Sequence, residues 1–150
     1  EVNGVAVSER IAPAMPTPPE NCNAWASERV VFPEFAGGHI AFVSKNQHES
    51  GACAIASLWN GVPADIASFV IAVDDSVDLH DWQRVLFHWC ANCDPGRDMI
   101  QRGHRIAFDA TSKQAGSVIN GQPVRDYPPI LTMSDEIKRR VDERWTEYGF

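Results

Sequence analysis

A run of five apolar residues, Phe69-Val70-Ile71-Ala72-Val73, constrains the fold of this 150-residue chain more than any other feature. Its length and its β-branched residues are typical of a strand, and its uninterrupted apolar character predicts that the strand is buried on both faces. The run ends in Asp74-Asp75, and a helical pattern follows over residues 79–93. This succession of strand and helix predicts an α/β fold, in which helices cover a sheet.

Further strands are expected on both sides of this unit. Residues 24–32 and 39–44 are predicted to be strands, with Gly37-Gly38 as the turn between them. Residues 94–133 are rich in turn and loop signals and contain one short candidate strand at 105–108. The fold class predicted from these elements is α/β, with a small mixed sheet covered by helices and a helix at the C-terminus.

Three helices are predicted, each with one apolar face. The helix over residues 49–60 is expected to end with Gly61 in the C′ position and Pro63 as a stop. Asp78 is the expected N-cap of the helix over 79–93, and Ser134 is that of the last helix. The three faces are Ala52, Ile55, Ala56 and Trp59; Trp82, Val85, Leu86 and Trp89; and Ile137, Val141 and Trp145.

The length of the chain indicates one domain with a connector in front of it. Residues 1–21 contain the proline-rich stretch 12–19, which cannot form a regular helix or a central strand, so we expect a connector here and the α/β domain over 22–150. Glu1 is not an initiator methionine, and no signal-peptide pattern follows it. We therefore expect the chain to begin inside a longer gene product or to lose its start by processing.

Charge and cysteine content exclude several classes of function. The net charge is −7, from 20 acidic and 13 basic residues, and no basic stripe is present, which argues against binding to nucleic acid or to an anionic membrane surface. No apolar run approaches the roughly 20 residues that a membrane span needs. Four widely spaced cysteines do not make a disulfide framework, so a reducing, cytoplasmic compartment is predicted.

Two cysteine and histidine motifs have simpler explanations than catalysis or metal binding. Cys90 and Cys93 form a C-x-x-C at the expected C-terminal end of a helix, where the helix dipole disfavours a thiolate, so we interpret them as packing residues. The isolated Cys22 and Cys53 do not supply the second close pair that a zinc site needs. The start of an H-E-x-x-H motif at His48 lacks its second histidine.

The acidic cluster after the apolar strand has a structural explanation as well. Asp74, Asp75 and Asp78 lack the glycine and the final glutamate that an EF-hand loop requires, and a strand end followed by a helix cap accounts for all three. The sequence contains no nucleophile elbow, phosphate-binding loop or dinucleotide fingerprint. From these residues alone we predict a soluble α/β domain without a self-contained catalytic set, which works together with something else.

Five segments, in order, resemble the C-terminal portion of the UbiD family of decarboxylases. Residues 69–82 (FVIAVDDSVDLHDW) resemble the family's strand, acidic turn and following helix, and residues 40–59 resemble the strand and helix before that turn. Residues 93–98 (CDPGRD) are similar to its D-P-x-R-D turn, and residues 108–113 (FDATSK) to its G-x-D-A-T-x-K segment. Residues 141–149 (VDERWTEYG) resemble its closing V-x-x-x-W-x-x-x-G helix.

This resemblance implies a function for the assembled protein rather than for this chain alone. UbiD-type enzymes use prenylated FMN as an electron sink to remove or add CO2, without oxidation, on aromatic or α,β-unsaturated acids. In that family the flavin, its divalent metal and the catalytic residues lie in the preceding domain, whereas the C-terminal domain closes one side of the cleft and mediates oligomerisation. The resemblance therefore implies a flavin-binding partner domain or subunit, and it assigns no catalytic, cofactor-binding or metal-binding residue to this chain.

Two departures from the family pattern bear on the cleft. Only residues 99–107 separate the D-P-x-R-D turn from the D-A-T segment, so the family's pocket wall is expected to be open or supplied by a partner. Residues 63–68 contain none of the basic residues that often precede the strand in the family. Asn60, Asp65 and Ser68 are the candidate cleft-facing polar residues, and the alternative is that they belong to a solvated loop.

Three functions remain open at this stage. The preferred hypothesis is a subunit or fragment, inactive alone, that completes a prenylated-FMN decarboxylase or carboxylase. The second is a non-catalytic assembly or regulatory module that keeps the fold, which the shortened segment before Phe108 motivates. The third is an independent small enzyme that uses Cys90 and Cys93, and a double substitution of these cysteines by serine without loss of function would exclude it.

Overall fold

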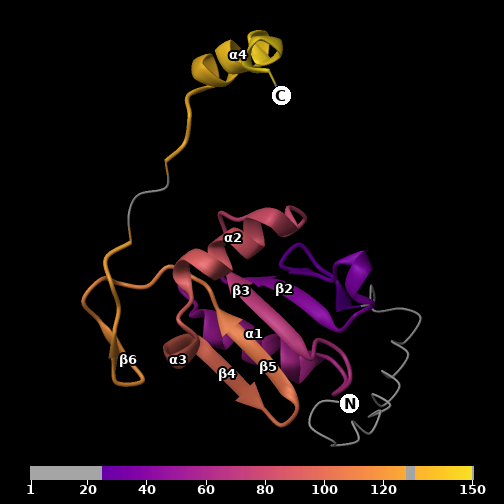
Figure 1. Ribbon diagram of the computed structural model, residues 1–150. Coiled ribbons are helices and arrows are strands. Elements are labelled where there is room, and N and C mark those ends of the chain that lie inside the picture. Colours follow the sequence, from indigo (N-terminus) through magenta and orange to yellow (C-terminus); the bar gives the residue numbers. More distant parts are fainter. Residues whose placement is uncertain (1–24, 128–130, 150) are drawn as a thin grey trace, which may run out of the picture.

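The computed structural model describes residues 25–127 and 131–149, and in this part of the chain a five-stranded sheet lies between helices (Figure 1). The predicted connector over 1–21 lies outside the described residues and stays a prediction. The strands are β1 (Val30–Val31), β2 (Ile40–Ser44), β3 (Phe69–Val73), β4 (Met99–Arg102), β5 (Arg105–Asp109), β6 (Val118–Ile119) and β7 (Gln122–Pro123). The helices are α1 (Gly51–Gly61), α2 (Trp82–Asn92), α3 (Pro95–Asp98) and α4 (Asp135–Glu143), with 3₁₀ turns η2 (Glu34–Ala36) and η3 (Trp145–Tyr148).

The sheet is mixed, as predicted. Its strand order is β1-β2-β3-β5-β4, and the three central strands run parallel, with Ile40 opposite Phe69 and Phe69 opposite Ile106. The two outer strands, β1 and β4, run antiparallel to their neighbours. Because β2, β3 and β5 are parallel, their carboxyl ends meet at one edge of the sheet.

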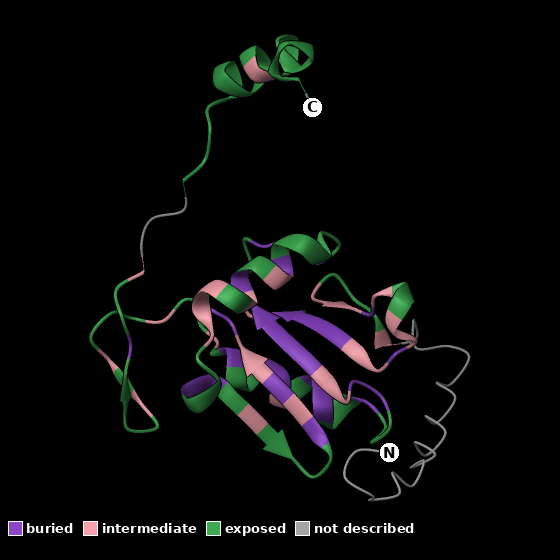
Figure 2. Cartoon of the chain, viewed as in Figure 1, coloured by how far each residue is buried: buried purple, intermediate pink, exposed green. Residues whose placement is uncertain are grey.

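Helices cover both faces of the sheet, which explains the apolar run in β3. On one face α1 packs on small and branched residues of the three parallel strands, with Ile55, Leu58 and Trp59 buried. On the other face α2 packs through Val85 on Phe42 and on the second set of strand residues. Strand β3 is buried from Val70 through Val73, and Figure 2 shows the central strands as the most buried part of the molecule.

The predicted strand over 24–32 is wrong in length, because only Val30–Val31 pairs as a strand with β2. Ser27 and Val30 exchange both of their backbone hydrogen bonds across the turn at Glu28-Arg29, at 2.9 and 3.1 Å. The chain therefore reverses just before the strand. Pro33, which has no N–H to donate, ends it on the other side.

The first helix begins two residues later than predicted, and its buried face is shifted. The hydroxyl of Ser50 accepts a hydrogen bond from the backbone N–H of Cys53 at 3.2 Å and so caps α1. Ala52 is exposed, although the sequence placed it on the apolar face. Gly61 is the last helical residue rather than a left-handed C′ glycine, and Val62 caps the helix in an extended conformation.

The second helix begins at Trp82 rather than at residue 79, because Asp78 is used for a different local bond. The Asp78 carboxylate accepts from the backbone N–H of His80 at 2.9 Å, which holds a turn before the helix. Asp81 is the N-cap instead, accepting from the backbone N–H of Arg84 at 3.0 Å. The sequence also placed Trp82 on the buried face, whereas its side chain is 46% exposed.

The segment 94–133 contains more regular structure than predicted. The candidate strand at 105–108 is confirmed as β5, but α3, β4, β6 and β7 were not predicted. These four elements are two to four residues long, so they carry no periodic pattern of their own and depend on pairing partners.

The C-terminal helix is confirmed, and so is its Ser134 cap, whose hydroxyl accepts from the backbone N–H of Ile137 at 3.4 Å. Figure 1 shows α4 standing away from the sheet, and residues 131–149 are all exposed except the half-buried Val141. The predicted apolar face of this helix therefore does not contribute to the core. In residues 25–127 and 131–149, no helix combines the length and apolar character needed to cross a bilayer.

Candidate functional site

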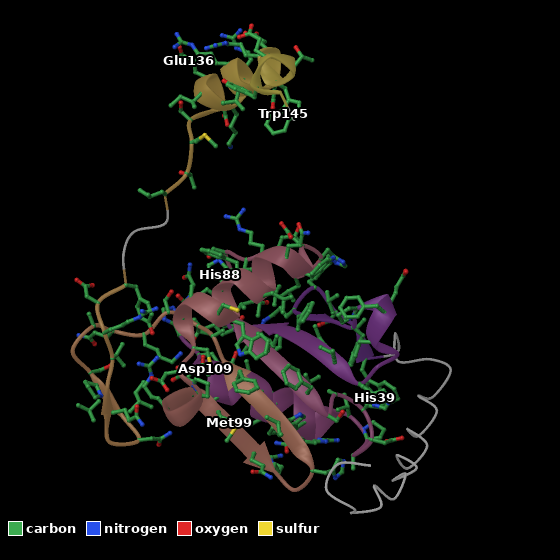
Figure 3. The ribbon with its side chains drawn as sticks, viewed as in Figure 1. His39, His88, Met99, Asp109, Glu136 and Trp145 are labelled. Atoms are coloured by element: carbon green, nitrogen blue, oxygen red, sulfur yellow. The ribbon has the colours of Figure 1, made fainter. Side chains whose placement is uncertain are left out.

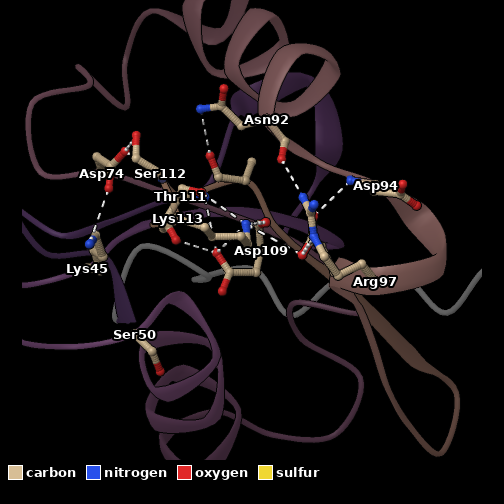
Figure 4. Close-up of polar contacts among 12 residues, drawn as sticks. Lys45, Ser50, Asp74, Asn92, Asp94, Arg97, Asp109, Thr111, Ser112 and Lys113 are labelled. Carbon is tan, nitrogen blue, oxygen red and sulfur yellow. Dashed lines mark hydrogen bonds and ion pairs between the residues drawn. The ribbon is translucent and has the colours of Figure 1, made fainter. Parts of the chain in front are cut away.

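Charged side chains gather where the three parallel strands end. Lys45 follows β2, Asp74 follows β3, and Asp109 is the last residue of β5. Figure 3 shows Asp109 within the fold, and Figure 4 shows all three residues in close-up. In open α/β sheets, ligands bind in the crevice outside the carboxyl ends of the strands, so this edge is the candidate site. We call the following eight residues, which are joined by hydrogen bonds and ion pairs, the carboxyl-edge cluster: Lys45, Asp74, Arg97, Asp98, Asp109, Thr111, Ser112 and Lys113.

Asp74 ties the three strand ends together. Its Oδ1 lies 3.3 Å from Lys45 Nζ, and its Oδ2 accepts from the backbone N–H of Ser112 at 2.8 Å and from the Ser112 hydroxyl at 2.7 Å. The segment after β5 is thus fastened to the end of β3, which explains the acidic residue at this position better than a metal site would.

The most buried charges of the cluster belong to Arg97 and Asp98. Asp98 accepts from Arg97 Nε at 2.8 Å and from Arg97 Nη2 at 2.7 Å, and its Oδ2 also accepts from the backbone N–H of Asp94 at 2.8 Å. Burial alone would raise the pKa of Asp98, but the bonds from Arg97 and Asp94 and the nearby charge of Lys113 outweigh it and lower the pKa below its ordinary value. The same hydrogen bonds to Asp98 raise the pKa of Arg97.

Lys113 is surrounded by oxygen atoms from the loop that contains it. Its Nζ donates to the carbonyls of Asp109 at 2.6 Å and Thr111 at 2.9 Å, and it lies 3.6 Å from the carboxylate oxygens of Asp98 and Asp109. Thr111 adds two bonds to Asp109 Oδ1, from its N–H at 3.1 Å and its hydroxyl at 2.5 Å. The loop therefore folds around the ammonium group, which fixes the backbone of residues 109–113 at the edge of the sheet.

The first turn of α1 lies against this loop. A Cβ placed on Gly51 would overlap the Asp109 carboxylate, so a larger residue here would displace that carboxylate from its contacts with Thr111 and Lys113. The amino end of a helix carries a partial positive charge, and a carboxylate beside it is stabilised. The strand end, the loop and the helix thus meet at a close approach that a larger residue at position 51 would disturb.

Arg97 also connects the cluster to the end of α2. Its Nη2 donates to the carbonyl of Asn92 at 3.3 Å, and the Tyr127 hydroxyl donates to the same carbonyl at 3.0 Å. The Asn92 amide donates to the carbonyl of Ala110 at 3.2 Å. Next to it, burial lowers the pKa of His88, which is only 7% exposed. The end of α2 is therefore anchored both to the cluster and to the segment that leads towards α4.

This arrangement positions backbone rather than performing bond-making chemistry. The cations Lys45, Arg97 and Lys113 are each engaged by protein oxygens, and the carboxylates of Asp98 and Asp109 each have partners. Among the residues that the structure describes, no three His, Cys, Asp or Glu side chains lie together as a metal site would need. What the cluster can do is hold the loops at this edge in one conformation, against which another surface can fit.

The three predicted cleft-facing residues lie elsewhere in the fold and do not form a group with the cluster. Asn60 is exposed, and its Oδ1 accepts from Arg102 at 2.9 Å. The Ser68 hydroxyl donates to the carbonyl of His39 at 3.3 Å, at the amino end of β3, and Asp65 is exposed in the loop between them. All three therefore lie towards the amino ends of the parallel strands, and their facing a cleft stays a prediction.

Residues 63–68 contain no basic residue of their own. In the structure, Arg105 of β5 lies against this segment. The guanidinium of Arg105 donates to the carbonyls of Trp59 (2.9 Å), Val62 (3.3 Å), Pro63 and Ala64 (3.1 Å), although the side chain is almost fully buried. Burial lowers the pKa of Arg105 from its ordinary value. Its four acceptors are carbonyls at the end of α1 and just beyond it, so this arginine secures that loop.

The C-x-x-C motif lies at the C-terminal end of α2, as predicted, but only Cys93 packs against the core; the prediction that Cys90 is a packing residue is wrong, because Cys90 is exposed. Cys93 is the C-cap of α2, and burial raises its pKa to about 11, with the charge of Asp98 acting in the same direction. Cys53, Cys90 and Cys93 are free thiols. A thiol with a raised pKa is a poor nucleophile at neutral pH, which weighs against an enzyme that depends on Cys93.

The residues of the carboxyl-edge cluster were not predicted as a site, although several of them lie in the motifs that carried the family resemblance. Residues 24–122 match the model of the 3-octaprenyl-4-hydroxybenzoate carboxy-lyase C-terminal domain, UbiD_C. The chain belongs to this family. The matched residues contain the whole cluster, whereas α4 follows the matched region.

Comparisons with individual proteins agree with this membership. An uncharacterized protein of Aquifex aeolicus (strain VF5) is 26% identical over 155 residues, covering 83% of this chain and 32% of that protein. The vanillic acid decarboxylase of Sedimentibacter hydroxybenzoicus in an open form, with a truncated second component, is 18% identical, with a TM-score of 0.51 over 79% of this chain and 30% of that one. Its closed form is 16% identical and also has a TM-score of 0.51. At these identities the solved structures show a shared fold.

A further structure is that of an evolved dimeric form of the UbiD-class enzyme HmfF from Pelotomaculum thermopropionicum in complex with prFMN. It is 24% identical, with a TM-score of 0.44 over 50% of this chain and 18% of that chain. The chain thus spans about a third or less of the length of the proteins that it resembles. The family model that it matches describes one domain, the C-terminal domain.

Proposed function

We propose that this chain completes a UbiD-type decarboxylase or carboxylase, as a subunit or as a domain of a longer protein, and is inactive alone. The reaction is the non-oxidative removal or addition of CO2 on an aromatic or α,β-unsaturated acid. In the assembled protein the chain closes one side of the active-site cleft and takes part in oligomerisation. Its free thiols and scattered cysteines support a reducing, cytoplasmic location.

The observation that carries this proposal has two parts: the chain matches a C-terminal domain of the family, and the buried charged side chains of its carboxyl edge are paired with one another. Residues 24–122 match the C-terminal domain of the family, and they include a carboxyl edge whose side chains are joined by hydrogen bonds and ion pairs. In the described residues, the buried charges of that edge are paired with one another, so they supply rigidity and not a reactive group. The reactive groups must therefore come from the partner domain or subunit.

The cofactor proposed for the assembly is prenylated FMN with a divalent metal, and the described residues do not fit it. A flavin phosphate needs cationic or N–H donors that are free to point at it. The cations of the cluster, Lys45, Arg97 and Lys113, contact carboxylates and carbonyls of this chain. Arg105 is buried, and it donates its hydrogen bonds to backbone carbonyls. We therefore assign the flavin and the metal to the partner, and we assign to this chain the roles of orienting the cleft and excluding water.

Reconstitution tests the proposal directly. The 150-residue chain is mixed with a flavin-bearing UbiD-type chain from the same organism, and native mass spectrometry and the absorption spectrum are recorded. We expect a complex that carries a flavin chromophore and releases CO2 from a 4-hydroxybenzoate-type acid, with little turnover from either chain alone. If the two chains fail to associate, or if the flavin-bearing chain turns over equally well without this one, the proposal is wrong.

The second candidate is a non-catalytic assembly or regulatory module, and the hairpin β4–β5 favours it. Between α3 and the loop that follows Asp109, the chain forms only Met99–Arg102, a turn and Arg105–Asp109, so it builds no longer wall there. If the chain is removed and the remaining complex stays assembled but loses turnover, the assembly-module hypothesis fails. If turnover persists while the size of the assembly changes, that hypothesis is supported.

A further inference from the structure

An open apolar groove lies between α2 and the sheet face that α2 covers. Its volume is about 670 Å³, almost all of its exposed lining is apolar, and it contains no residue of the carboxyl-edge cluster. Two of its aromatic side chains are well exposed, Phe35 by 69% and Trp82 by 46%. Their rings meet edge to face at 6.2 Å between centroids, although Phe35 lies in η2 and Trp82 begins α2. A contiguous apolar hollow with exposed aromatic residues is characteristic of an interaction site.

The lining of the groove is mainly aromatic. Besides Phe35 and Trp82 it includes Phe42, Phe69 and Trp89. Aromatic-lined grooves bind proline-rich segments in the polyproline II (PPII) conformation, because the proline rings pack on the aromatic rings and the PPII backbone leaves its carbonyls free to accept hydrogen bonds. Among the residues that the structure describes, the indole N–H groups of Trp82 and Trp89 have no acceptor. Both groups are thus available to the carbonyls of a docked segment.

The sequence of this chain contains a segment of that kind, the proline-rich stretch 12–19, which lies outside the described residues. Every third residue in its main part is a proline: Pro13, Pro16 and Pro19. A PPII helix has three residues per turn, so these rings would share one edge of such a helix. Met15 and Pro18 would form a second apolar edge, and Thr17 belongs to the third, more polar edge. In this conformation the stretch presents two apolar edges to a groove and one polar edge to solvent.

A second hollow connects the groove with the start of the described chain. Its volume is about 510 Å³, and it is lined by Ala26 and Ser27 as well as by Phe35 and Trp82, which also line the groove. Pro19 lies six positions before Trp25, and six extended residues span up to roughly 20 Å. The proline-rich stretch is therefore tethered beside a continuous path that leads to the groove.

The tether favours the chain's own segment over a free partner. A segment that is covalently attached near its binding site has an effective concentration in the millimolar range, so even a weak contact is occupied. PPII is also largely preformed in proline-rich sequences, so little conformational entropy is lost when such a segment docks. A segment from a second copy would have to make the same contacts from a far lower concentration.

We propose that residues 12–19 dock as a PPII helix in the groove of the same chain, with the proline edge against the exposed rings of Phe35 and Trp82. The docked segment covers these two rings, and its carbonyls accept hydrogen bonds from the indole N–H groups of the groove. The chain before residue 12 then leaves the domain on the face that α2 covers. This inference goes beyond the proposed function, and it does not depend on the decarboxylase reaction, because it needs no flavin and no partner domain.

The first test changes the segment and observes the groove, in the full 150-residue chain. Pro16→Asp places a carboxylate on the proline edge, where docking would bury it without a partner, whereas Thr17→Asp places the same charge on the polar edge. The indole N–H signals are recorded by two-dimensional NMR. We expect Pro16→Asp to lower the ratio of docked to undocked chain by at least about tenfold and so to shift the signals of Trp82 and Trp89. Thr17→Asp is expected to leave both signals unchanged.

The second test changes the groove and observes the segment through the methyl group of Met15. Aromatic rings shift the NMR signal of a methyl group packed among them away from the position of an exposed methionine. Phe35→Glu places a charge at the groove and is expected to return the Met15 signal to that exposed position. Phe87→Glu is the matched control, because Phe87 is an exposed aromatic residue of α2 that does not line this groove. It is expected to leave the Met15 signal where it is in the unmodified chain.

Three results would overturn the proposal. The first is a Met15 signal at the exposed position in the unmodified chain, and the second is an equal effect of Pro16→Asp and Thr17→Asp on the Trp82 signal. The third is docking that disappears on tenfold dilution, since a second copy would then supply the segment. The backbone spectrum shows whether each variant is folded, and Phe35→Ala replaces Phe35→Glu if the latter is not.

Discussion

Replacement of Asp98 by asparagine is the most informative single perturbation of the carboxyl-edge cluster. The Asp98 side chain is only 1% exposed, and it takes two hydrogen bonds from Arg97 while lying 3.6 Å from Lys113. The substitution preserves size but removes the negative charge, so two buried cations lose their shared counterion. Breaking a buried ion pair from one side costs about 3–5 kcal/mol, and we expect Asp98→Asn to lower the free energy of unfolding by that amount.

The measurement is urea unfolding followed by far-UV circular dichroism, with the denaturant slope m required to stay constant. Asp75→Asn is the matched control, because Asp75 is an exposed carboxylate next to Asp74 and its replacement is expected to change stability by no more than about 0.5 kcal/mol. A loss of under 1 kcal/mol for Asp98→Asn would refute the reasoning, since an amide would then serve the two cations as well as a carboxylate.

The pH dependence of this difference has a definite sign. The pKa of Asp98 is lowered in the folded protein, so its charge stabilises the fold above the unfolded value of about 4, and this contribution is lost as pH falls through the lower folded pKa. We therefore expect the stability gap between the unmodified chain and Asp98→Asn to be full near pH 7 and to narrow below about pH 4. A gap that stays constant down to pH 2 would show that the charge of Asp98 is not responsible.

Three further predictions follow from single contacts. Arg105→Met should destabilise the fold by about 2–3 kcal/mol, because buried carbonyls lose their donor, whereas the exposed Arg102→Met should cost less than about 1 kcal/mol; equal effects in urea unfolding would contradict this. Gly51→Ala should be destabilising, since its Cβ would overlap a carboxylate. Gly61→Ala places its Cβ where no atom lies within 4 Å, so it should be neutral or stabilising by up to about 1 kcal/mol. A lower melting temperature for Gly61→Ala than for Gly51→Ala would refute the close approach. Cys93, with a pKa of about 11, should be alkylated by iodoacetamide at pH 8 more slowly than the exposed Cys90. Equal labelling of the two cysteines in peptide mass spectra would rule out the raised pKa of Cys93.

The parts of the fold that the sequence predicted are those in which local pattern and tertiary environment agree. Residues 69–73 are apolar throughout because both faces of β3 are covered, and the strand has the predicted bounds. Ser134 was recognised as a cap because its hydroxyl is used locally, three residues from its partner. Asp78 shows where this local reasoning fails: its carboxylate bonds to His80 and not to a helix N–H, and a sequence does not reveal which of two nearby amides an aspartate will take.

The candidate site was not predictable in the same way, since its contacts join residues that are distant in sequence. Ser112 bonds to Asp74, which is 38 residues earlier, and Lys113 reaches Asp98 across a whole hairpin. Periodicity and capping rules contain no information on such pairs. The sequence did contain one usable signal, because acidic residues directly after two predicted strands, at Asp74 and Asp109, belong to the carboxyl edge of a parallel sheet.

The short segment between Asp98 and Phe108 has a structural role that the sequence did not reveal, while its effect on the pocket wall stays a prediction. A missing stretch of chain implied an open pocket wall, but the residues that remain form a hairpin that completes the sheet as β4 and carries Arg105 onto the carbonyls after α1. The hairpin therefore stabilises the end of the domain opposite the carboxyl-edge cluster. Because the two ends are held by separate sets of buried contacts, changes in the hairpin turn at Gly103 are expected to leave the hydrogen bonds and ion pairs of the cluster intact.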